Sequence, residues 1–269
     1  MSIPTEPIGS LPRPRELMEG MRAFAEGRLS REALNRIGDL AVRQTIEQLE
    51  ATGSPIITDG EQTKPSFATY PVWGLSNVAA DGVAIPFADG HVRVLPRLTS
   101  GPFHYGIHAD EYLRVAQRYA QVPVKQAIIS ASALSLLYPP AGLTGYSREA
   151  FLDDLLREHE ADIRRCLQLG ACKVQIDFTE GRLALKLDPT GELLRSFVEL
   201  NNQVLERFSQ EERAKIGVHT CPGGDKDSTH SAEVDYAELL PSLFDLNAGS
   251  FYLRVIPFLV GNLRGSLVD

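Results

Sequence analysis

The sequence predicts an α/β fold of the parallel (β/α)8-barrel type, in which about six of the eight strands can be found. Short apolar runs alternate with amphipathic helical stretches along the chain. Most of these runs are continuously hydrophobic, as strands are when helices cover the sheet. Acidic residues, a histidine and a cysteine follow directly after several runs. A parallel barrel gathers its functional groups at those carboxyl ends of strands.

A doubly wound open sheet also binds ligands at the carboxyl ends of its strands. However, the spaced glycines of a dinucleotide-binding loop do not follow the first predicted strand. We therefore prefer the barrel. The sequence shows no repeat, low-complexity tract or flexible linker that would mark a domain boundary.

The first half of the chain contains patterns for strands, helices and a hairpin. "EPIGSLPRP" indicates a strand near residue 8 that enters a loop, and "SPIITDGE" indicates a buried strand near residue 56. Residues 30–52 have the period of an amphipathic helix that begins after Ser30. Its predicted apolar stripe consists of Leu34, Ile37, Leu40, Ala41 and Ile46. Residues 83–97 predict a hairpin around Asp89-Gly90, inside an excursion over about residues 74–100.

The second half repeats a strand-and-helix alternation. Residues 108–120 are predicted to be helical, and a buried strand is expected near residue 127. A long helix should begin after Ser147, its N-cap, and end before Gly170, its C′ residue. Further strands are expected near residues 174, 217 and 252, with helices over "LLRSFVELNNQVLERFS" and "DYAELLPSLFDLN" between them.

Composition limits the class of protein. The 269 residues are 43% hydrophobic and 23% charged, which is typical of soluble globular proteins. A net charge of −8 argues against nucleic acid or an anionic membrane as a partner. No signal peptide and no apolar membrane-spanning run are found in the sequence. The three cysteines, Cys166, Cys172 and Cys221, are too few for a disulfide scaffold, so a reducing cytoplasm is expected.

His219 and Cys221 are the most distinctive pair. They alternate across a strand end in "KIGVHTCPGGDKDSTH", so both side chains point to one face. Imidazole and thiolate on one face suit zinc, although a catalytic zinc usually has three protein ligands. The alternative is a histidine at a strand end beside a buried cysteine. The glycines that follow lack the Gly-Lys-Ser/Thr of a phosphate-binding loop.

Carboxylates at two other strand ends are further candidates. Asp59 and Glu61 flank Gly60 at the end of an apolar strand, and Asp177 directly follows "KVQI". Buried carboxylates need partners or shift their pKa, so they often mark function. A polar turn is the alternative. Gly9-Ser10 offers backbone amides and a hydroxyl that could hold a ligand carboxylate.

Other polar and aromatic residues are expected to be structural. Cys166 and Cys172 should belong to the core or its surroundings, and His104, His108 and His159 show no partner in the sequence. Tyr70 and Trp73 could stack on a flat ring, but cover for a core is the simpler interpretation.

Taken together, "EPIGSLPRP", "ITDGEQTKPSF", "KVQIDFTEG" and "VHTCPGGDKDSTHS" resemble the catalytic domain of cobalamin-independent methionine synthase. They are most similar to its short single-domain relatives, the 5-methyltetrahydropteroyltriglutamate–homocysteine methyltransferase-like proteins. The resemblance runs from about residue 6 to residue 254 and implies a (β/α)8 barrel. It therefore implies one barrel domain over residues 1–254, followed by a divergent tail over residues 255–269. It also implies methyl transfer from a methylfolate to the thiol of homocysteine.

The resemblance implies roles for single residues. His219 and Cys221 would be zinc ligands, joined in the family by a glutamate and a late cysteine. Gly9, Ser10 and Asp59 would belong to the substrate site. Glu61 and Asp177 would hold the ammonium group of homocysteine. Zinc would keep the acceptor sulfur as thiolate, the reactive form, at neutral pH.

The chain departs from the family at its C-terminal end. Where the glutamate ligand is expected, "SFYLRVIPF" places Arg254, and the late cysteine is absent. We therefore expect a C-terminally truncated or frameshifted version of a longer enzyme, with Asp225, Asp227 or His230 as conceivable substitute ligands. Two alternatives follow: another thiol methyltransferase or decarboxylase of the same superfamily, or a catalytically inactive homologue.

Overall fold

The centre of the molecule is a parallel sheet of four strands in the order β10-β7-β6-β5. The computed structural model describes residues 5–221, 224–225, 229–230 and 235–253. The strands are β5 (Lys125–Ile129), β6 (Lys173–Asp177), β7 (Ile216–Thr220) and β10 (Ser250–Leu253). Every pairing between them is parallel. The predicted α/β class with a parallel sheet is confirmed, as are the strands near residues 127, 174, 217 and 252.

The strands predicted near residues 8 and 56 are not formed. Residues 5–14 have no regular secondary structure, and Ile57 makes a single parallel bridge to Val124. Prolines explain part of this difference, because Pro7, Pro12 and Pro55 lack the N–H that a ladder needs. The two segments still extend the sheet edge, since Leu11 N donates to Gly60 O at 3.0 Å and Lys125 N donates to Ile57 O at 2.8 Å.

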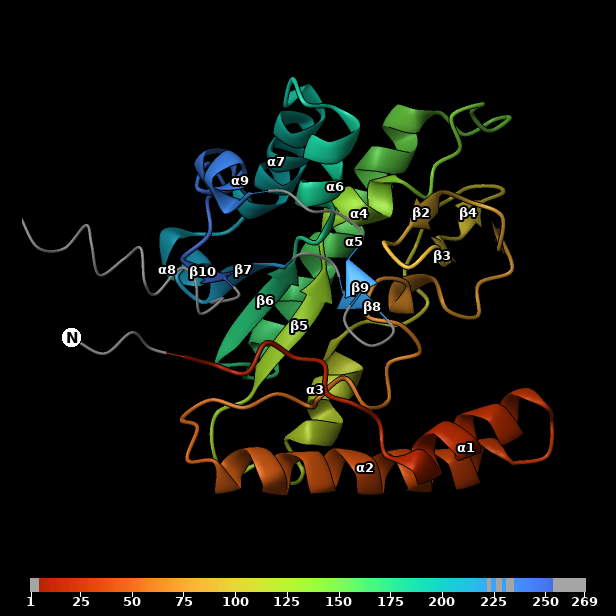
Figure 1. Cartoon of the computed structure of the whole chain (residues 1–269), viewed down its shortest axis with the longest axis vertical. Coiled ribbons are helices and arrows are strands. Elements are labelled where there is room, and N and C mark those ends of the chain that lie inside the picture. Colours follow the sequence, from red (N-terminus) through yellow and green to blue (C-terminus); the bar gives the residue numbers. More distant parts are fainter. Residues whose placement is uncertain (1–4, 222–223, 226–228, 231–234, 254–269) are drawn as a thin grey trace, which may run out of the picture.

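Helices cover the sheet and extend the molecule beyond it (Figure 1). Two of the predicted N-caps are confirmed, because Ser30 accepts from Ala33 N and Ser147 accepts from Ala150 N. The shorter helices α1, α4, α6 and α8 were not predicted. The helices are α1 (Arg15–Ala25), α2 (Arg31–Ala51), α3 (Asp110–Ala116), α4 (Ala131–Ser135), α5 (Arg148–Gln168), α6 (Glu180–Leu187), α7 (Glu192–Leu205), α8 (Gln210–Arg213) and α9 (Tyr236–Leu243), with a 3-10 turn η1 (Tyr70–Val72).

The prediction that Leu40 belongs to the buried stripe of α2 is wrong. Leu40 is 53% exposed, whereas Ala41 and Ile46 are buried. The buried face of this helix is formed by Gly38, Ala41, Val42, Thr45 and Ile46. Because successive residues turn by about 100° around a helix, Leu40 lies opposite that face.

The predicted hairpin is confirmed. Strand β2 (Ala84–Pro86) pairs antiparallel with β3 (Val92–Val94) on either side of Asp89-Gly90. Strand β1 (Val78–Ala79) pairs with β4 (Arg97–Leu98) at its base. A further short antiparallel pair joins β8 (Gly224–Asp225) to β9 (Thr229–His230). The predicted tail over residues 255–269 lies outside the described residues.

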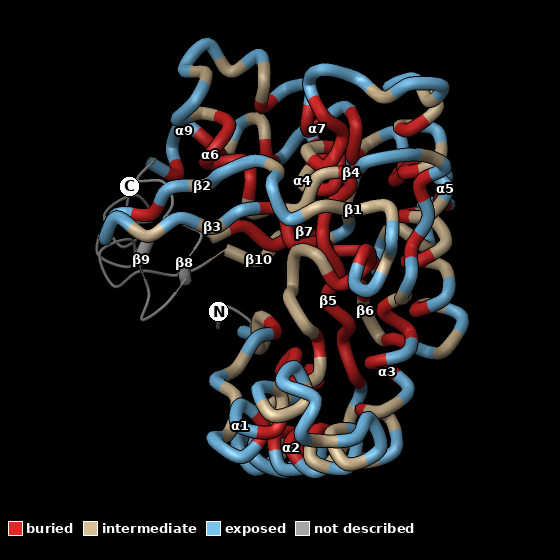
Figure 2. The backbone as a smooth tube through the Cα atoms, turned by 90° about the vertical axis from the view of Figure 1, so that its right-hand side faces the viewer, coloured by how far each residue is buried: buried red, intermediate tan, exposed pale blue. Residues whose placement is uncertain are grey.

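The two faces of the sheet differ in chemistry. Ile128, Val174, Ile176 and Val218 share one face of the sheet and join the hydrophobic core with residues of α5 and α7. Figure 2 shows the backbone of β5, β6 and β7 as mostly buried. In the register of the strands, the alternate residues share the opposite face: Lys125, Lys173, Gln175, Asp177, Gly217 and His219. We call this side the polar face, and it carries the candidate site.

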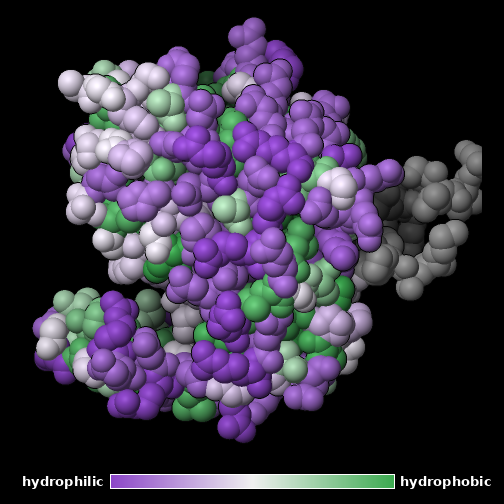
Figure 3. Space-filling model, turned by 180° about the vertical axis from the view of Figure 1, so that it is seen from behind, coloured by the Kyte–Doolittle hydropathy of each residue, from purple (hydrophilic) through white to green (hydrophobic). Residues whose placement is uncertain are grey.

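The face of the molecule seen in Figure 3 is largely hydrophilic. On the face seen in Figure 3, hydrophilic residues predominate and the hydrophobic ones are scattered among them. Among the described residues, none of the helices combines the length and apolar character that a bilayer crossing requires.

Candidate active site

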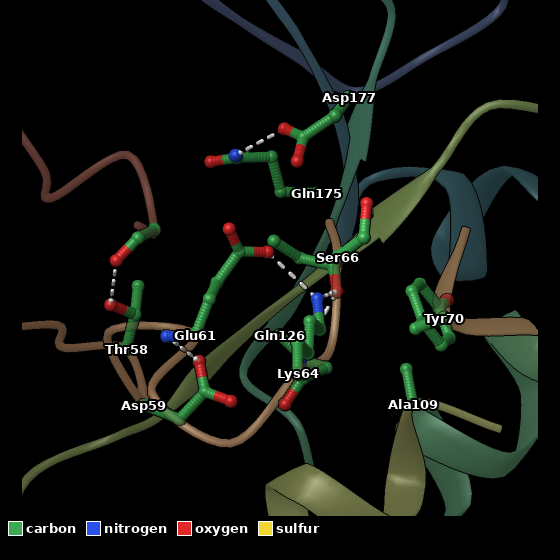
Figure 4. Close-up of polar contacts among 12 residues, drawn as sticks. Thr58, Asp59, Glu61, Lys64, Ser66, Tyr70, Ala109, Gln126, Gln175 and Asp177 are labelled. Carbon is green, nitrogen blue, oxygen red and sulfur yellow. Dashed lines mark hydrogen bonds and ion pairs between the residues drawn. The ribbon is translucent and has the colours of Figure 1, made fainter. Parts of the chain in front are cut away.

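The Asp-Gly-Glu segment forms a tight turn at the edge of the sheet. Gly60 has φ 65° and Glu61 has φ 53°, so two successive residues adopt the left-handed conformation. That region is unfavourable for a non-glycine residue such as Glu61. The turn is held by Asp59 Oδ1, which accepts from Glu61 N at 3.0 Å, and by Thr58 Oγ1, which donates to Gly9 O at 3.1 Å. The strained backbone directs the Glu61 side chain toward the polar face (Figure 4).

Glu61 forms a buried ion pair with Lys64. Lys64 Nζ donates to Glu61 Oε1 at 2.8 Å and to Ala127 O at 2.7 Å. The side chain of Lys64 is 0% exposed and that of Glu61 is 4% exposed. Burial raises the pKa of Glu61, and the charge of Lys64 opposes the rise. Burial would lower the pKa of Lys64, but the charges of Glu61 and Asp59 outweigh it, so this amine stays protonated.

Asp177 and His219 are joined on the neighbouring strands. Asp177 Oδ1 accepts from Gln175 Nε2 at 2.8 Å and lies 3.0 Å from His219 Nδ1. Burial alone would lower the pKa of His219, but hydrogen bonds with Asp177 and Cys221 raise it to about 10. A carboxylate that contacts one ring nitrogen of a histidine favours a proton or a metal ion at the other ring nitrogen. The His219–Cys221 contact agrees with the prediction that both side chains share a face.

A cavity of about 370 Å³ opens beside this turn, and both Ser10 and Glu61 line it. Its wall is completed by the loop that contains Ser66 and Thr69 and by Arg93 of the hairpin. Gly9 is buried behind Ser10, and a Cβ added to it would lie 3.8 Å from Glu61 Cδ. The predicted excursion therefore forms part of the cavity wall.

The structure gathers the predicted site residues in one region. Asp59 and Glu61 belong to the turn, and Gly9 is hydrogen-bonded to it through Thr58, whereas Asp177, His219 and Cys221 lie at the ends of β6 and β7. Glu61 and Asp177 repel each other electrostatically, which raises the pKa of Glu61 further. Within the described ranges, however, His, Cys, Asp and Glu form no group of three or more that could hold a metal ion. The side chains of Asp225, Asp227 and His230 lie outside the described residues.

Several other sequence candidates are structural. Cys166 is buried in α5, and His159 Nε2 lies 2.9 Å from Ile129 O in a setting where burial lowers its pKa to about 4. Tyr70 is fully buried, as expected of core cover, whereas Trp73 is 54% exposed.

Sequence reasoning missed two residues that hold the site together. Lys64 lies three residues after Glu61, and Gln175 lies two residues before Asp177. Gln175 could have been found, because residues two apart on a strand share a face. Nothing in the local pattern marks Lys64 as buried, since it follows a turn in a polar stretch. Only its contact with Ala127, 63 residues later, shows its place.

The fold and these residues define a class of α/β protein in which polar side chains gather at the carboxyl ends of parallel strands. No family model matches the chain. A methionine synthase of Sulfurisphaera tokodaii is 35% identical over 255 residues, which cover 94% of this chain and 68% of the relative. The chain belongs to the methionine synthase family, as the sequence motifs predicted.

Two solved structures share the fold. A B12-independent methionine synthase from Shewanella sp. W3-18-1 in complex with selenomethionine superposes with a TM-score of 0.64 at 20% identity. The match covers 84% of this chain and 63% of that one, so the chain spans less than two thirds of the Shewanella protein. A putative vitamin-B12-independent methionine synthase from Listeria monocytogenes gives a TM-score of 0.60 at 20% identity over 90% of this chain and 70% of that one.

Proposed function

We propose that this chain transfers a methyl group from 5-methyltetrahydrofolate, or its polyglutamate, to the thiol of homocysteine and so forms methionine. The observation that carries the proposal is the joined set of Asp177, His219 and Cys221 beside the buried carboxylate of Glu61. This set brings a potential sulfur-binding centre close to anionic groups that suit an ammonium ion. Membership of the methionine synthase family supports the same reaction.

In this proposal the carboxylates bind the acceptor. Glu61 and Asp177 would hold the ammonium group of homocysteine, and Asp59 would fix the turn that presents Glu61. Ser10 lines the cavity and would donate to the acceptor carboxylate, with Gly9 allowing close approach of the backbone. Holding acceptor and donor in line lowers the entropic part of the barrier.

Zinc is the implied metal, and the residues present fit it in kind. His219 and Cys221 offer the nitrogen and sulfur donors that zinc prefers, and Asp177 supports the imidazole from behind, as carboxylates commonly do in zinc sites. Two donors do not complete a zinc site, so a third must come from beyond this pair. When bound, zinc would stabilise the acceptor sulfur as thiolate. The methyl–nitrogen bond of the donor breaks as the sulfur–carbon bond forms, and the departing nitrogen must gain a proton.

We further propose that residues 1–254 form an incomplete domain of the (β/α)8-barrel type, of which the described residues show four parallel strands. Its polar face is strongly curved, because the ring of Tyr252 on β10 lies 3.9 Å from Lys125 Nζ on β5, across two intervening strands. Glu6 also contacts both Lys125 and Lys173. A cytoplasmic location, and the absence of nucleic acid and membrane partners, stay predictions from composition.

One observation favours an inactive, ligand-binding homologue as the second candidate. The described residues contain no three-ligand metal group, and two donors hold zinc weakly. Another thiol acceptor or a decarboxylation also stays open, although the His-x-Cys pair favours thiol chemistry.

The first experiment measures zinc per folded chain by elemental analysis of gel-filtered protein, together with methionine formation from homocysteine and methylfolate. We expect near one zinc per chain, lost in His219→Ala, and activity that falls by at least about a hundredfold in the same variant. Zinc without activity toward homocysteine would favour another thiol. A folded wild-type chain that retains no zinc would contradict the proposed reaction and favour the inactive homologue.

A further inference from the structure

Lys64 is a fully buried lysine, and its ammonium group is held at three sides. Nζ donates to Glu61 Oε1 at 2.8 Å and to Ala127 O at 2.7 Å. It also lies 4.8 Å from the centre of the Tyr70 ring and 5.8 Å from that of Tyr112, within the range of cation–π attraction. A lysine bound in this way is a fixed positive charge of the site.

The ammonium group of Lys64 interacts with three carboxylates. The anionic groups that act on Lys64 are Glu61, Asp59 and Asp177, and all three of these side chains are buried. Without a counter-charge, buried carboxylates that lie close together cannot all ionise, and one of them would take up a proton. Burial, Asp177 and Asp59 all favour the neutral form of Glu61, and Lys64 opposes them.

Lys64 binds one oxygen of Glu61 and leaves the other available. Figure 4 shows Oε1 directed to Lys64 while the rest of the carboxylate extends toward Gln175 and Asp177. The described residues donate no hydrogen bond to Oε2, and Glu61 lines the 370 Å³ cavity. An ionised carboxylate with a free oxygen at a cavity wall is suited to bind a cationic group.

We propose that Lys64 is a positioning residue of the acceptor site, which keeps Glu61 ionised and oriented so that its second oxygen receives the ammonium group of an amino-acid ligand. This inference rests on the proposed function, because it assigns Glu61 to acceptor binding. It gives a role to a residue that lies inside the motif "ITDGEQTKPSF" but to which the sequence analysis assigned none, and it predicts a pH signature of ligand binding.

The support for Lys64 extends to α5. The hydroxyl of Tyr70 donates to Asp162 Oδ2 at 2.5 Å, and Asp162 Oδ1 accepts from Ala109 N at 2.6 Å. Tyr70 and Asp162 are 0% and 1% exposed. This network fixes the ring against which the Lys64 ammonium lies, so packing against α5 contributes to the position of the charge.

The test is calorimetric binding of L-methionine, the product of the proposed reaction, whose thioether releases no proton, across pH 6 to 9. In Lys64→Met, Glu61 loses its counter-charge and stays protonated to higher pH. An acid is neutral below its pKa, so we expect affinity about tenfold weaker than wild type at pH 6.5, with the difference shrinking as the pH rises. Lys215→Met, at an exposed lysine, is the matched control and should bind as wild type does.

Two further measurements make the result decisive. In a Glu61→Gln background, adding Lys64→Met should change affinity by less than about twofold, because the group that Lys64 controls is gone. If Lys64→Met does not fold, the test is the number of protons released when methionine binds to the wild type. This number is measured by calorimetry at pH 6.5 in two buffers of different ionisation enthalpy. Almost no proton should be released; release of about one proton per methionine would show that Glu61 is protonated before binding.

The outcomes separate the two proposals. Methionine binding by the wild type, with unchanged affinity in folded Lys64→Met at every pH, would overturn the role of Lys64 and leave the proposed function standing. A wild-type chain that binds no methionine at millimolar concentration would overturn the proposed function and, with it, this role of Lys64.

Discussion

Glu180 is a buried acid that lies three residues after Asp177 and has no role in the proposed reaction. Its Oε1 accepts hydrogen bonds from Ser130, at 2.6 Å, and from Ser132. Oε2 is buried without a hydrogen-bond partner among the described residues. Burial raises the pKa of Glu180 to about 7, because the two serine hydroxyls compensate only part of the lost hydration.

We expect Glu180→Gln to remove a pH dependence of stability. The pKa of Glu180 is about 7 in the folded chain, and its ordinary value, taken for the unfolded chain, is 4.5. Between pH 4.5 and pH 7 the folded chain therefore holds a proton on Glu180 that the unfolded chain has released. The free energy of unfolding of the wild type should therefore fall by up to about 3 kcal/mol as pH rises from 4.5 to 7. Urea unfolding at pH 5 and pH 8 checks this, with exposed Glu206→Gln as control. Parallel wild-type and Glu180→Gln profiles would contradict it.

At the scale of the secondary-structure element, Gly217 on β7 allows the sheet to curve. A Cβ added there would lie 2.5 Å from Tyr252 Cε2 and 2.6 Å from Ser250 Oγ. The missing side chain lets the Tyr252 ring cross the polar face and reach Lys125. Gly217→Ala should lower the free energy of unfolding by about 1–3 kcal/mol, because the added methyl overpacks this contact.

The Gly217 prediction is checked by urea unfolding in two backgrounds. In Tyr252→Ala the ring is gone, so the additional cost of Gly217→Ala should become smaller. An equal cost in both backgrounds would mean that the ring does not restrict residue 217.

At the scale of the whole molecule, Glu6 joins the N-terminal segment to the sheet. Its carboxylate lies 2.7 Å from Lys173 Nζ and 3.2 Å from Lys125 Nζ. Burial opposes ionisation of Glu6, but the hydrogen bond from Lys173 and the charge of Lys125 outweigh it and lower its pKa. Glu6 therefore stabilises the fold above pH 4.5, and this contribution is lost as pH falls below that value.

Glu6→Gln should destabilise the chain by about 3 kcal/mol at pH 7, because it removes the carboxylate that forms an ion pair with the buried amine of Lys125. Lys125 is 0% exposed, so water cannot replace the lost partner. The measurement is the midpoint of thermal and urea unfolding, with exposed Glu16→Gln as the matched control. A change no larger than that of the control would contradict the proposed role of Glu6.

The sequence by itself determined the local features of this protein. Short, largely apolar runs indicated β5, β6, β7 and β10, because the face of a strand that helices cover is hydrophobic. Ser30 and Ser147 marked helix starts through hydrogen bonds made within one turn. The motifs around Glu61, Asp177 and His219 indicated the family, since each is a short stretch of neighbouring residues.

Only the tertiary structure decided which distant groups meet. Ile57 and the segment around Gly9 look like strands in the sequence, but proline and the left-handed turn at Gly60 and Glu61 restrict their pairing. Lys64 looks like an ordinary surface lysine until Ala127, Tyr70 and Tyr112 surround it. Lys64 is buried because residues distant in the sequence pack around it, and a local sequence pattern does not predict such contacts.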